Sequence, residues 1–461
     1  MIFTSIEFLI FCATVFALYW WGCRGRSALQ NLFLVAASYV FYGWVDWRFC
    51  GLLLLSTGCA YATGRWMEVS SRNGRVAVGV SLALNLGILC FNKYFNFFAQ
   101  SFCEAARAIG VMMDAPTLNL ILPIGISFYS FMSISYTLDV YWGRARPATN
   151  VLAFFACMDF FPQLLAGPIS RVGTAIEQFK VPRTFDYVLA VDGCRQILWG
   201  LFKKIVIADG CAKLTGYIWA DYQALPGSTL LVGAFIYTMQ IYADFSGYSD
   251  IAIGCGKLFG VRLMRNFAFP YFATNIADFW RRWHISLTTW FRDYIYIPLG
   301  GSRCGRVRHI RNIFIVFLLS GLWHGANWTF VAWGFVHACF FVPLLFLPKG
   351  EGTVRRLFAW TVTFFAVMLA WMFFRAPSIS MAVSYLENLF SRSLFVLPRF
   401  YLSMMPWIAV MLATEWLQRD KEHGFALERY PMILRWLLYL AFSIFCITYF
   451  QRSSEFIYFQ F

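Results

Sequence analysis

The sequence has few charged side chains for its length. Asp, Glu, Lys and Arg make up 13% of its 461 residues, against roughly 25% in an average soluble domain. Hydrophobic residues make up 60% and aromatic residues 20%, and the mean hydropathy is +0.61. One core could not hide this much apolar surface from water. The composition therefore excludes an ordinary soluble globule and predicts a polytopic membrane protein.

Acidic residues are scarcer than basic ones. The chain has 23 Asp and Glu against 38 Lys and Arg, for a net charge of +15. Such an excess could indicate a nucleic-acid partner, but the basic residues lie in short loops between apolar runs, which is typical of cytoplasmic loops. We therefore expect membrane lipids, and no nucleic acid, among the partners.

Several motifs of known chemistry are missing. The sequence contains no HExxH, Walker A, GxSxG or GxGxxG, which argues against a zinc protease, an NTPase and a serine-elbow hydrolase. No two of its 13 Cys lie within three positions of each other, so CxxC pairs are absent and we expect no metal site. The N-terminus enters an apolar run with no basic stretch before it, which predicts a retained first span and no cleaved signal peptide.

Apolar runs follow one another along the whole chain. A helix needs about 20 residues to cross a hydrocarbon core of ~30 Å. The candidate runs are 2–21, 28–45, 49–63, 76–91, 118–142, 151–166, 186–208, 229–254, 312–347, 355–375, 397–417 and 430–450. The run 312–347 should break near Gly321 and Gly325, and the run 151–166 is the one that we least expect to cross. The sequence predicts an all-α protein with about eleven transmembrane helices plus re-entrant or interfacial helices.

Nothing in the sequence marks a second domain. It has no internal repeat, low-complexity tract or Ser/Pro-rich linker, so a single transmembrane domain should fill residues 1–461. Cationic loops follow the first, third and fifth runs, and residues 256–311 carry ten Lys or Arg against two acids. Because cytoplasmic loops are rich in Lys and Arg, these segments should be cytoplasmic and the N-terminus should lie outside.

His324 is the polar residue that stands out most clearly. It lies in SGLWHGANWTF (320–330), inside a run that has no Asp, Glu, Lys or Arg and one other histidine, His337. An ionisable group at membrane depth marks a candidate functional site. Asn327, three positions on, could orient the ring or a substrate carbonyl. The alternative is a hydrogen-bonded packing histidine beside Trp323 and Trp328. We expect that second role for His337, and surface positions for His309 and His423.

His284 lies in ADFWRRWHISLTTWFRDYIYIPLGG (277–301). Helical spacing puts Trp280, Trp283, Leu287, Phe291 and Tyr294 on one face, which predicts one interfacial helix with His284 at the border of that face. There the ring could point into a cavity or only reach the membrane surface. Arg281 and Arg282, off the apolar face, could receive an anionic, nucleotide-bearing donor, although lipid headgroups explain the same residues.

Asp244 and Asp250 lie in YADFSGYSDIAIG (242–254), near the end of an apolar run. Two carboxylates this close can act in metal or acid–base chemistry. The Ser and Gly residues between them favour a helix break with capping side chains. Ser246 and Asp250 remain candidate donor-binding residues.

The same residues lie in blocks that resemble the membrane-bound O-acyltransferase (MBOAT) family, specifically the bacterial branch typified by the alginate O-acetyltransferase membrane subunit. The blocks are LPIGISFYSFMSISYTLDVYWG (122–143), FFPQLLAGPISR (160–171), QIYADFSGYSDIAIGCGKLFG (240–260), NFAFPYFATNIADFWRRWHISLTTWFRDYIYIPLGGSR (266–303) and SGLWHGANWTFVAWGFVHA (320–338). The resemblance covers nearly the whole chain and is most specific over 266–338, the expected catalytic core.

The resemblance implies a fold and an activity. The fold is a ring of membrane helices around a tunnel, with the family's catalytic His at His324 and its second site position at His284. Members of this branch take acetyl groups from cytoplasmic acetyl-CoA and pass them outward, with no bound cofactor. A periplasmic SGNH-type transferase or esterase and other secretion proteins then acetylate an exopolysaccharide such as alginate or cellulose. The implied location is the bacterial inner membrane.

The residues fit acyl transfer. The reaction needs a base for the incoming hydroxyl and donors for the oxyanion, and we expect His324 to be the general base. Asn327 or His284 could stabilise the oxyanion or position the thioester, while Trp280, Trp283 and Trp323 could shelter it from water. Two other classes remain open: a transporter or flippase of a small anionic or lipid-linked substrate, and a structural scaffold of a polysaccharide secretion complex.

Overall fold

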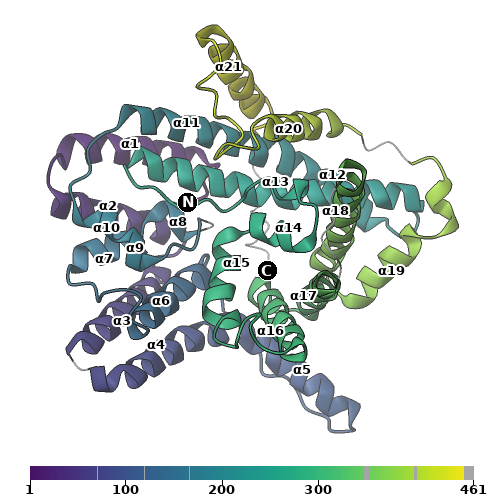
Figure 1. Ribbon diagram of the computed structural model, residues 1–461, viewed down its shortest axis with the longest axis horizontal. Helices are drawn as coiled ribbons and strands as arrows, with labels where there is room; N and C mark the ends of the chain where they lie inside the picture. The colour runs from purple at the N-terminus through teal and green to yellow at the C-terminus, as the bar shows by residue number, and fades with distance from the viewer. Residues whose placement is uncertain (70, 119, 166, 347–351, 399–401, 451–461) are drawn as a thin grey trace. The chain divides into compact units, whose positions relative to one another are not determined.

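The computed structural model describes the chain except for residues 70, 119, 166, 347–351, 399–401 and 451–461. Throughout the described residues the regular elements are helices, with no strand (Figure 1), so the predicted all-α class is confirmed. The predicted runs 118–142, 151–166, 312–347 and 397–417 each include residues outside the described ones, namely 119, 166, 347 and 399–401. Contacts group the chain into two compact units, Met1–Val191 with Cys255–Met264 and Asp192–Gly254 with Arg265–Phe461.

The first unit combines hydrophobic packing with buried hydrogen bonds between helices. Its helices are α1 (Ile6–Gly22), α2 (Ser27–Gly43), α3 (Phe49–Val69), α4 (Gly74–Leu89), α5 (Phe95–Ala108), α6 (Ile126–Tyr141), α7 (Val151–Met158), α8 (Phe161–Leu164), α9 (Val172–Ala175) and α10 (Glu177–Lys180). Ser56 of α3 donates to Asn85 of α4 at 2.6 Å, and Ser81 of α4 lies 2.9 Å from the hydroxyl of Thr137 in α6. Such bonds hold helices together in lipid, where the hydrophobic drive between helices is absent.

The second unit carries the remaining helices. They are α12 (Asp209–Ala220), α14 (Ile276–Arg282), α15 (Ile285–Phe291), α16 (Arg306–His324), α17 (Trp328–Phe341), α18 (Thr353–Arg375), α19 (Ile379–Leu389), α20 (Met405–Leu417) and α21 (Met432–Thr448). Two helices, α11 (Tyr187–Leu201) and α13 (Gly227–Leu258), carry residues of both units. A π-helical stretch, η3 (Phe202–Ala208), continues α11.

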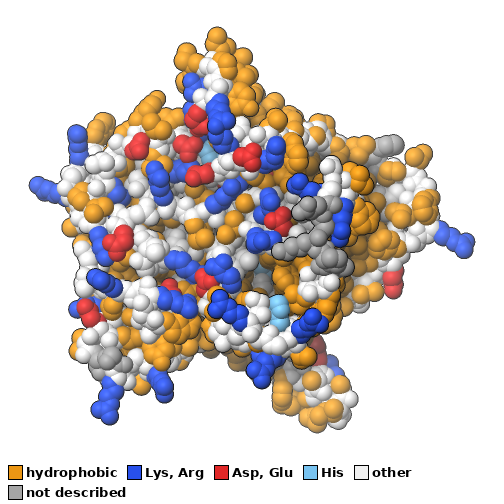
Figure 2. Space-filling model, in the orientation of Figure 1, with side chains coloured by type: hydrophobic (Ala, Val, Ile, Leu, Met, Phe, Trp, Pro, Cys, Tyr) orange, Lys and Arg blue, Asp and Glu red, His pale blue; other side chains and the backbone are white. Residues whose placement is uncertain are grey.

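Fewer helices are long and apolar enough to cross a membrane than the sequence predicted. Among the described residues, three segments combine sufficient length and hydropathy: Gly74–Ala108, Trp328–Leu345 and Thr353–Arg375. The count of about eleven spans is therefore not confirmed. Helices α1 and α2 have 17 residues each and reach about 25 Å, short of a core of ~30 Å. Figure 2 shows hydrophobic side chains interspersed with Lys and Arg on one face of the molecule.

The run 151–166 forms no spanning helix. Helix α7 ends at Met158 after eight residues, about 12 Å of helix, and the four-residue α8 follows after a break. The prediction that this run does not cross is confirmed.

The predicted break in the run 312–347 is also confirmed. Helix α16 ends at His324, where the N–H of Gly325 bonds to the carbonyl of Gly321. Helix α17 begins after Asn327, which caps it. The two helices form a hairpin in close backbone contact, because a Cβ added at Gly321 would lie 2.2 Å from the carbonyl oxygen of Phe330. Glycine is required there by lack of space.

We expect Gly321→Ala to lower the melting temperature of the purified protein. The added methyl group would force the hairpin apart, and overpacking of this kind costs about 1–3 kcal/mol. Gly79→Ala in α4 is the matched control, since no atom lies within 4 Å of an added Cβ there and alanine favours a helix by about 1 kcal/mol. Equal melting temperatures for the two variants would contradict the close packing.

Candidate active site

The segment around His284 is not the continuous helix that its spacing predicted. Helix α14 begins at the N-cap Asn275, whose side chain accepts the N–H of Asp278 at 2.8 Å, and ends at Arg282. His284 has φ of 43°, in the left-handed region, and α15 starts after it. A residue with positive φ does not continue a right-handed helix. The prediction of one interfacial helix is therefore wrong.

The apolar face predicted for this segment is nevertheless buried. Its members, Trp280, Trp283, Leu287, Phe291 and Tyr294, are at most 6% exposed. His284 is 0% exposed and does not lie at the border of a surface helix. A left-handed residue other than glycine costs about 1–3 kcal/mol and persists only where surrounding contacts hold it, which is common at functional sites.

The structure brings His284 and His324 together. His324 is the last residue of α16 and is 2% exposed. Its ring centroid lies 6.3 Å from that of His284, with the ring planes inclined at 58°. Two imidazoles that are distant in the sequence thus share one buried site in the second unit.

Aromatic rings surround the two histidines. The ring of Trp323 lies 5.8 Å from that of His284 and 5.0 Å from that of His324. The other close rings are Phe245 at 4.6 Å from His284, and Trp333 at 5.2 Å and Phe374 at 5.5 Å from His324. An enclosure of this kind excludes bulk water and strengthens electrostatic interactions inside it.

His284 is held neutral by its surroundings. It lies outside the three segments that are long and apolar enough to cross the membrane. Burial lowers its pKa to about 3, because desolvation disfavours the charged ring. At neutral pH the ring therefore has one N–H donor and one lone-pair acceptor.

Asn266 contacts His284 and was missed by the sequence analysis. It is 0% exposed, and its Oδ1 lies 3.2 Å from Nδ1 of His284. The same oxygen accepts from the backbone N–H and the hydroxyl of Ser286, at 3.2 and 3.0 Å. Its Nδ2 donates to Ser249 of α13 at 3.1 Å. The available signal was a lone amide before the apolar stretch FAFPYF, and nothing in the sequence connects it with His284.

The other predicted tryptophans pack against residues outside the histidine pair, or are exposed. Trp280 donates from Nε1 to Nδ1 of His337 at 3.3 Å, so the predicted hydrogen-bonded core role of His337 is confirmed. Trp283 packs against Trp371 at 5.0 Å between ring centroids. Trp328, considered above as a packing neighbour of His324, is 51% exposed.

The side-chain amide of Asn327 forms its hydrogen bonds with backbone groups. Its Oδ1 accepts from the N–H of Thr329 at 3.0 Å, and its Nδ2 donates to the carbonyl of Pro377 at 3.1 Å. Both groups of the amide thus serve to cap and brace α17, and no contact joins it to the histidine pair. Its predicted role at the oxyanion gains no support from this geometry.

Arg281 and Arg282 end α14, directly before the turn that carries His284. Arg281 is exposed, and the partly exposed Arg282 pairs with Asp278 at 3.1 Å. Arg282 thus already has a carboxylate partner, and Arg281 is the more exposed of the two.

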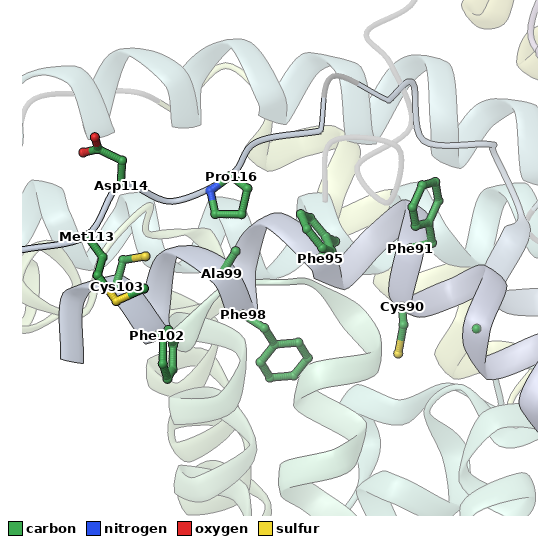
Figure 3. Close-up of a pocket in the computed structure, with 11 residues that line it drawn as sticks. Cys90, Phe91, Phe95, Phe98, Ala99, Phe102, Cys103, Met113, Asp114 and Pro116 are labelled. Carbon is green, nitrogen blue, oxygen red and sulfur yellow. The ribbon is translucent and has the colours of Figure 1, made fainter. Parts of the chain in front are cut away.

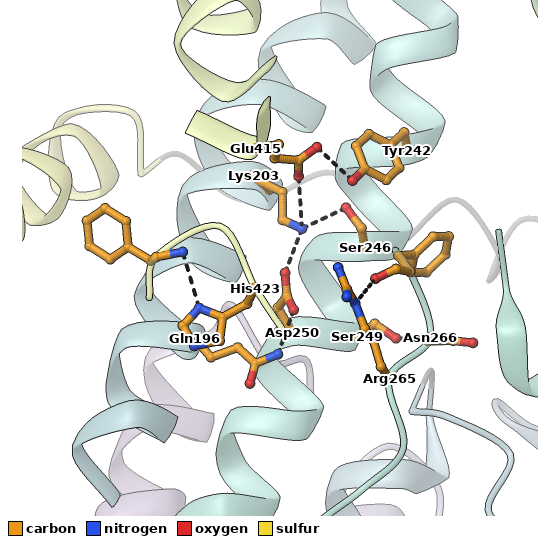
Figure 4. A network of polar contacts seen from close by, with 12 residues as sticks. Gln196, Lys203, Tyr242, Ser246, Ser249, Asp250, Arg265, Asn266, Glu415 and His423 are labelled. Carbon is orange, nitrogen blue, oxygen red and sulfur yellow. Dashed lines mark hydrogen bonds and ion pairs between the residues drawn. The ribbon is translucent and has the colours of Figure 1, made fainter. Parts of the chain in front are cut away.

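Ser246 and Asp250 belong to a buried ionic network rather than to a helix break (Figure 4). Helix α13 runs without interruption past both residues, so the predicted break with capping side chains is wrong. Nζ of Lys203 lies 2.6 Å from Asp250, 2.9 Å from Ser246 and 3.9 Å from Glu415. The carboxylates inside the helix are tolerated because a lysine neutralises them.

A second buried lysine pairs with the remaining carboxylate of this stretch. Lys204 lies 2.9 Å from Asp244 and 2.7 Å from Asp209. The sequence analysis missed both lysines and Glu415. A signal existed, since two adjacent Lys interrupt the apolar run 186–208.

The two remaining histidines, His309 and His423, differ in exposure. His309 is half-buried and lies 2.8 Å from the hydroxyl of Tyr296. His423 is 3% exposed and contacts Asp192 at 3.0 Å, so its predicted surface position is wrong. A carboxylate partner makes its burial possible.

Two cavities stand out among the described residues. A groove of about 680 Å³ in the first unit is lined by Phe91, Phe95, Phe98 and Phe102 beside Met113 and Pro116, and contains none of the candidate site residues (Figure 3). A polar cavity of about 10 Å³ in the second unit lies beside Lys203, Asp250, Ser249 and Asn266, room for about one water molecule.

The fold and the site define a class of protein: an all-helical membrane protein with two histidines enclosed by aromatic rings. Comparisons with known proteins can be tested against this class. The sequence profile of MBOAT, the membrane-bound O-acyltransferase family, matches residues 143–392. The chain belongs to this family, and it is an acyltransferase. All the candidate site residues lie inside the matched range, and the resemblance found in the sequence is confirmed.

Three relatives show the range of activities near this chain. The "Probable alginate O-acetylase AlgI" of Azotobacter vinelandii is 39% identical over 397 residues, 85% of this chain and 78% of that protein. The "Peptidoglycan O-acetyltransferase" of Helicobacter pylori is 35% identical over 78% of this chain and 73% of its own length. The "Teichoic acid D-alanyltransferase" of Bacillus subtilis is 28% identical over 56% of this chain and 68% of its own length.

Proposed function

We propose that the chain transfers acetyl groups from cytoplasmic acetyl-CoA across the inner membrane for O-acetylation of an exopolysaccharide such as alginate or cellulose. The observation that carries this proposal is the buried pair His284 and His324. Two relatives named as O-acetylating enzymes are at least 35% identical over most of this chain, which supports acetyl as the transferred group.

His324 acts as the general base in this scheme. It takes the proton from the acceptor hydroxyl as the hydroxyl oxygen attacks the thioester carbonyl carbon, and it returns that proton to the sulfur that leaves. One C–O bond forms, one C–S bond breaks, and the products are an O-acetyl ester and free coenzyme A. Trp323 touches both histidine rings and would keep water from the thioester.

Donor and acceptor meet the histidine pair from opposite sides of the membrane. The segment 256–311 faces the cytoplasm, as its excess of Lys and Arg indicates, and the N-terminus lies outside. Arg281 and Arg282 then offer positive charge to the phosphates of acetyl-CoA within three positions of His284. We further propose that the tunnel implied by the family resemblance joins the two sides.

The acceptor is reached through partner proteins. The printed names of the relatives differ in the polymer, alginate in one case, peptidoglycan and teichoic acid in others. We assign this chain the role of supplying the acetyl group, with a periplasmic SGNH-type transferase or esterase and other secretion proteins completing the transfer to the glycan.

Deletion of the gene should abolish O-acetylation of the exported polymer. Expression of this chain should restore acetyl ester, and label from [¹⁴C]acetyl-CoA supplied to the cytoplasmic face of membrane vesicles should reach the polymer. Mass spectrometry of the polymer and release of free coenzyme A measure the two ends of the reaction. Purified protein that moved a substrate across vesicles with no release of coenzyme A would overturn the proposal in favour of a transporter.

A further inference from the structure

We propose that Asn266 is a positioning residue that holds His284 in the tautomer with hydrogen on Nδ1, so that Nε2 presents a lone pair to the reacting groups. The importance of this arrangement for transfer depends on the proposed function, whereas the tautomer itself can be tested without any assay of activity.

The orientation of the Asn266 amide is fixed by its neighbours. The backbone N–H of Ser286 lies 3.2 Å from the atom assigned as Oδ1. A backbone N–H can only donate, so the atom facing it must be the amide oxygen. A reversed amide would bring its NH₂ against that N–H. On the other side, Nδ2 donates to the hydroxyl of Ser249 at 3.1 Å, which suits the same orientation.

The fixed oxygen decides the tautomer of His284. An amide oxygen only accepts, and it lies 3.2 Å from Nδ1 of His284, so Nδ1 must carry the hydrogen. The ring is fully buried beside Phe245 and Trp323, where a charged imidazolium would be costly. A neutral imidazole has only one N–H, and therefore Nε2 carries the lone pair.

The backbone holds the two residues in register. The carbonyl of Asn266 accepts the N–H of Ile285 at 2.9 Å, and the N–H of Ala268 donates to the carbonyl of Arg282 at 2.9 Å. These bonds lie on either side of His284, whose positive φ needs surrounding contacts to persist. The segment that carries Asn266 thus clamps both the backbone and the ring of His284.

The tautomer decides between the two roles considered for His284. Stabilising an oxyanion requires a hydrogen on the nitrogen that faces the thioester. With its hydrogen committed to Asn266, neutral His284 can only accept at Nε2. It then positions a proton-bearing group of a substrate beside His324, whose ring centroid is 6.3 Å away.

Nitrogen NMR of the full-length protein in lipid bilayers tests the tautomer. The chain has five histidines, so ¹⁵N-histidine labelling gives few signals, and His284→Gln assigns the one in question. We expect protonated Nδ1 and unprotonated Nε2 in the wild type. Asn266→Leu should lose this signature, and Asn266→Asp, which keeps an acceptor in the same place, should retain the hydrogen on Nδ1.

The control is Asn312→Leu. Asn312 is equally buried, but its amide donates to the carbonyls of Leu299 and Gly301 and not to His284, so its loss should leave the His284 signals unchanged. A hydrogen on Nε2 in the wild type, or an unchanged signature in Asn266→Leu, would overturn the assignment. The wild-type measurement decides even if Asn266→Leu does not fold.

A kinetic measurement tests the effect on transfer. With vesicles that acetylate polymer from acetyl-CoA, Asn266→Leu should lower kcat about 100-fold with KM for acetyl-CoA nearly unchanged, since a misplaced group costs about that much. Asn266→Asp should retain kcat within about tenfold. Full kcat in folded Asn266→Leu would overturn the positioning role. If the wild type transfers no acetyl group, the proposed function is wrong. The NMR measurement still tests the tautomer of His284 independently.

Discussion

Replacement of His324 by alanine should abolish acetylation of the exported polymer while leaving the protein in the membrane at its normal level. A positioned general base contributes about 10²–10⁴-fold to the rate, so acetyl ester should fall to background. The side chain is 2% exposed within rings of Trp323, Trp333 and Phe374. Mass spectrometry of the polymer and immunoblotting of the membrane fraction measure the two outcomes.

The matched control is His337→Gln. His337 is 0% exposed, on the helix that follows His324, and its ring packs 4.8 Å from that of Trp333, which also borders His324. Its Nδ1 bonds to Trp280, a structural contact. Glutamine at this position should leave acetylation within a few-fold of the wild type. Normal acetylation by a correctly inserted His324→Ala protein would show that the base lies elsewhere.

Lys203→Met should strongly destabilise the second unit. Its loss would leave the partly buried Asp250, at 2.6 Å, and the buried Glu415, at 3.9 Å, without this cation. Removing one partner of a buried ion pair costs about 3–5 kcal/mol because the other charge stays in a poor solvent. We expect the purified variant to lose its monodisperse gel-filtration peak at a markedly lower temperature than the wild type.

Two comparisons make this result specific. The double variant Lys203→Met with Asp250→Asn should recover part of the stability, since it removes charge of both signs. Lys180→Met provides the matched control, because Lys180 pairs with Glu177 at 2.7 Å but both side chains are exposed, and exposed pairs contribute about 0–1 kcal/mol. Similar losses for Lys203→Met and Lys180→Met would contradict the importance of the buried network.

Local sequence patterns predicted the helical class and some helix boundaries, but not the number of membrane spans. The run 229–254 appears as α13, and the run 312–347 breaks at Gly325, because helical segments and their breaks depend on neighbouring residues. The same logic failed at His284. The spacing of Trp280, Trp283 and Leu287 suits one helix, yet a left-handed backbone residue divides it. The hydrogen bonds that hold this turn come from Asn266 and Ala268, which the periodicity of the segment cannot reveal.

The sequence analysis assigned polar residues of the apolar runs to the site only where no ordinary structural role, such as capping a helix, explained them. His324 stood out because its apolar run contains no Asp, Glu, Lys or Arg. Lys203 and Lys204 were not singled out at all, and Asp244 and Asp250 were interpreted as helix caps. Their pairing depends on contacts between η3 and α13, elements whose faces meet only in the folded protein.

The sequence by itself determined that this protein is a helical membrane acyltransferase, and it singled out His284 and His324. Composition, hydropathy and local motifs can be read directly from the order of residues along the chain, without knowledge of the fold. Only the tertiary structure decided that the two histidines share one enclosure, that Asn266 orients one of them, and that the carboxylates of α13 neutralise lysines. These contacts depend on how helices cross and which faces meet, and a pattern along one segment does not encode its partners.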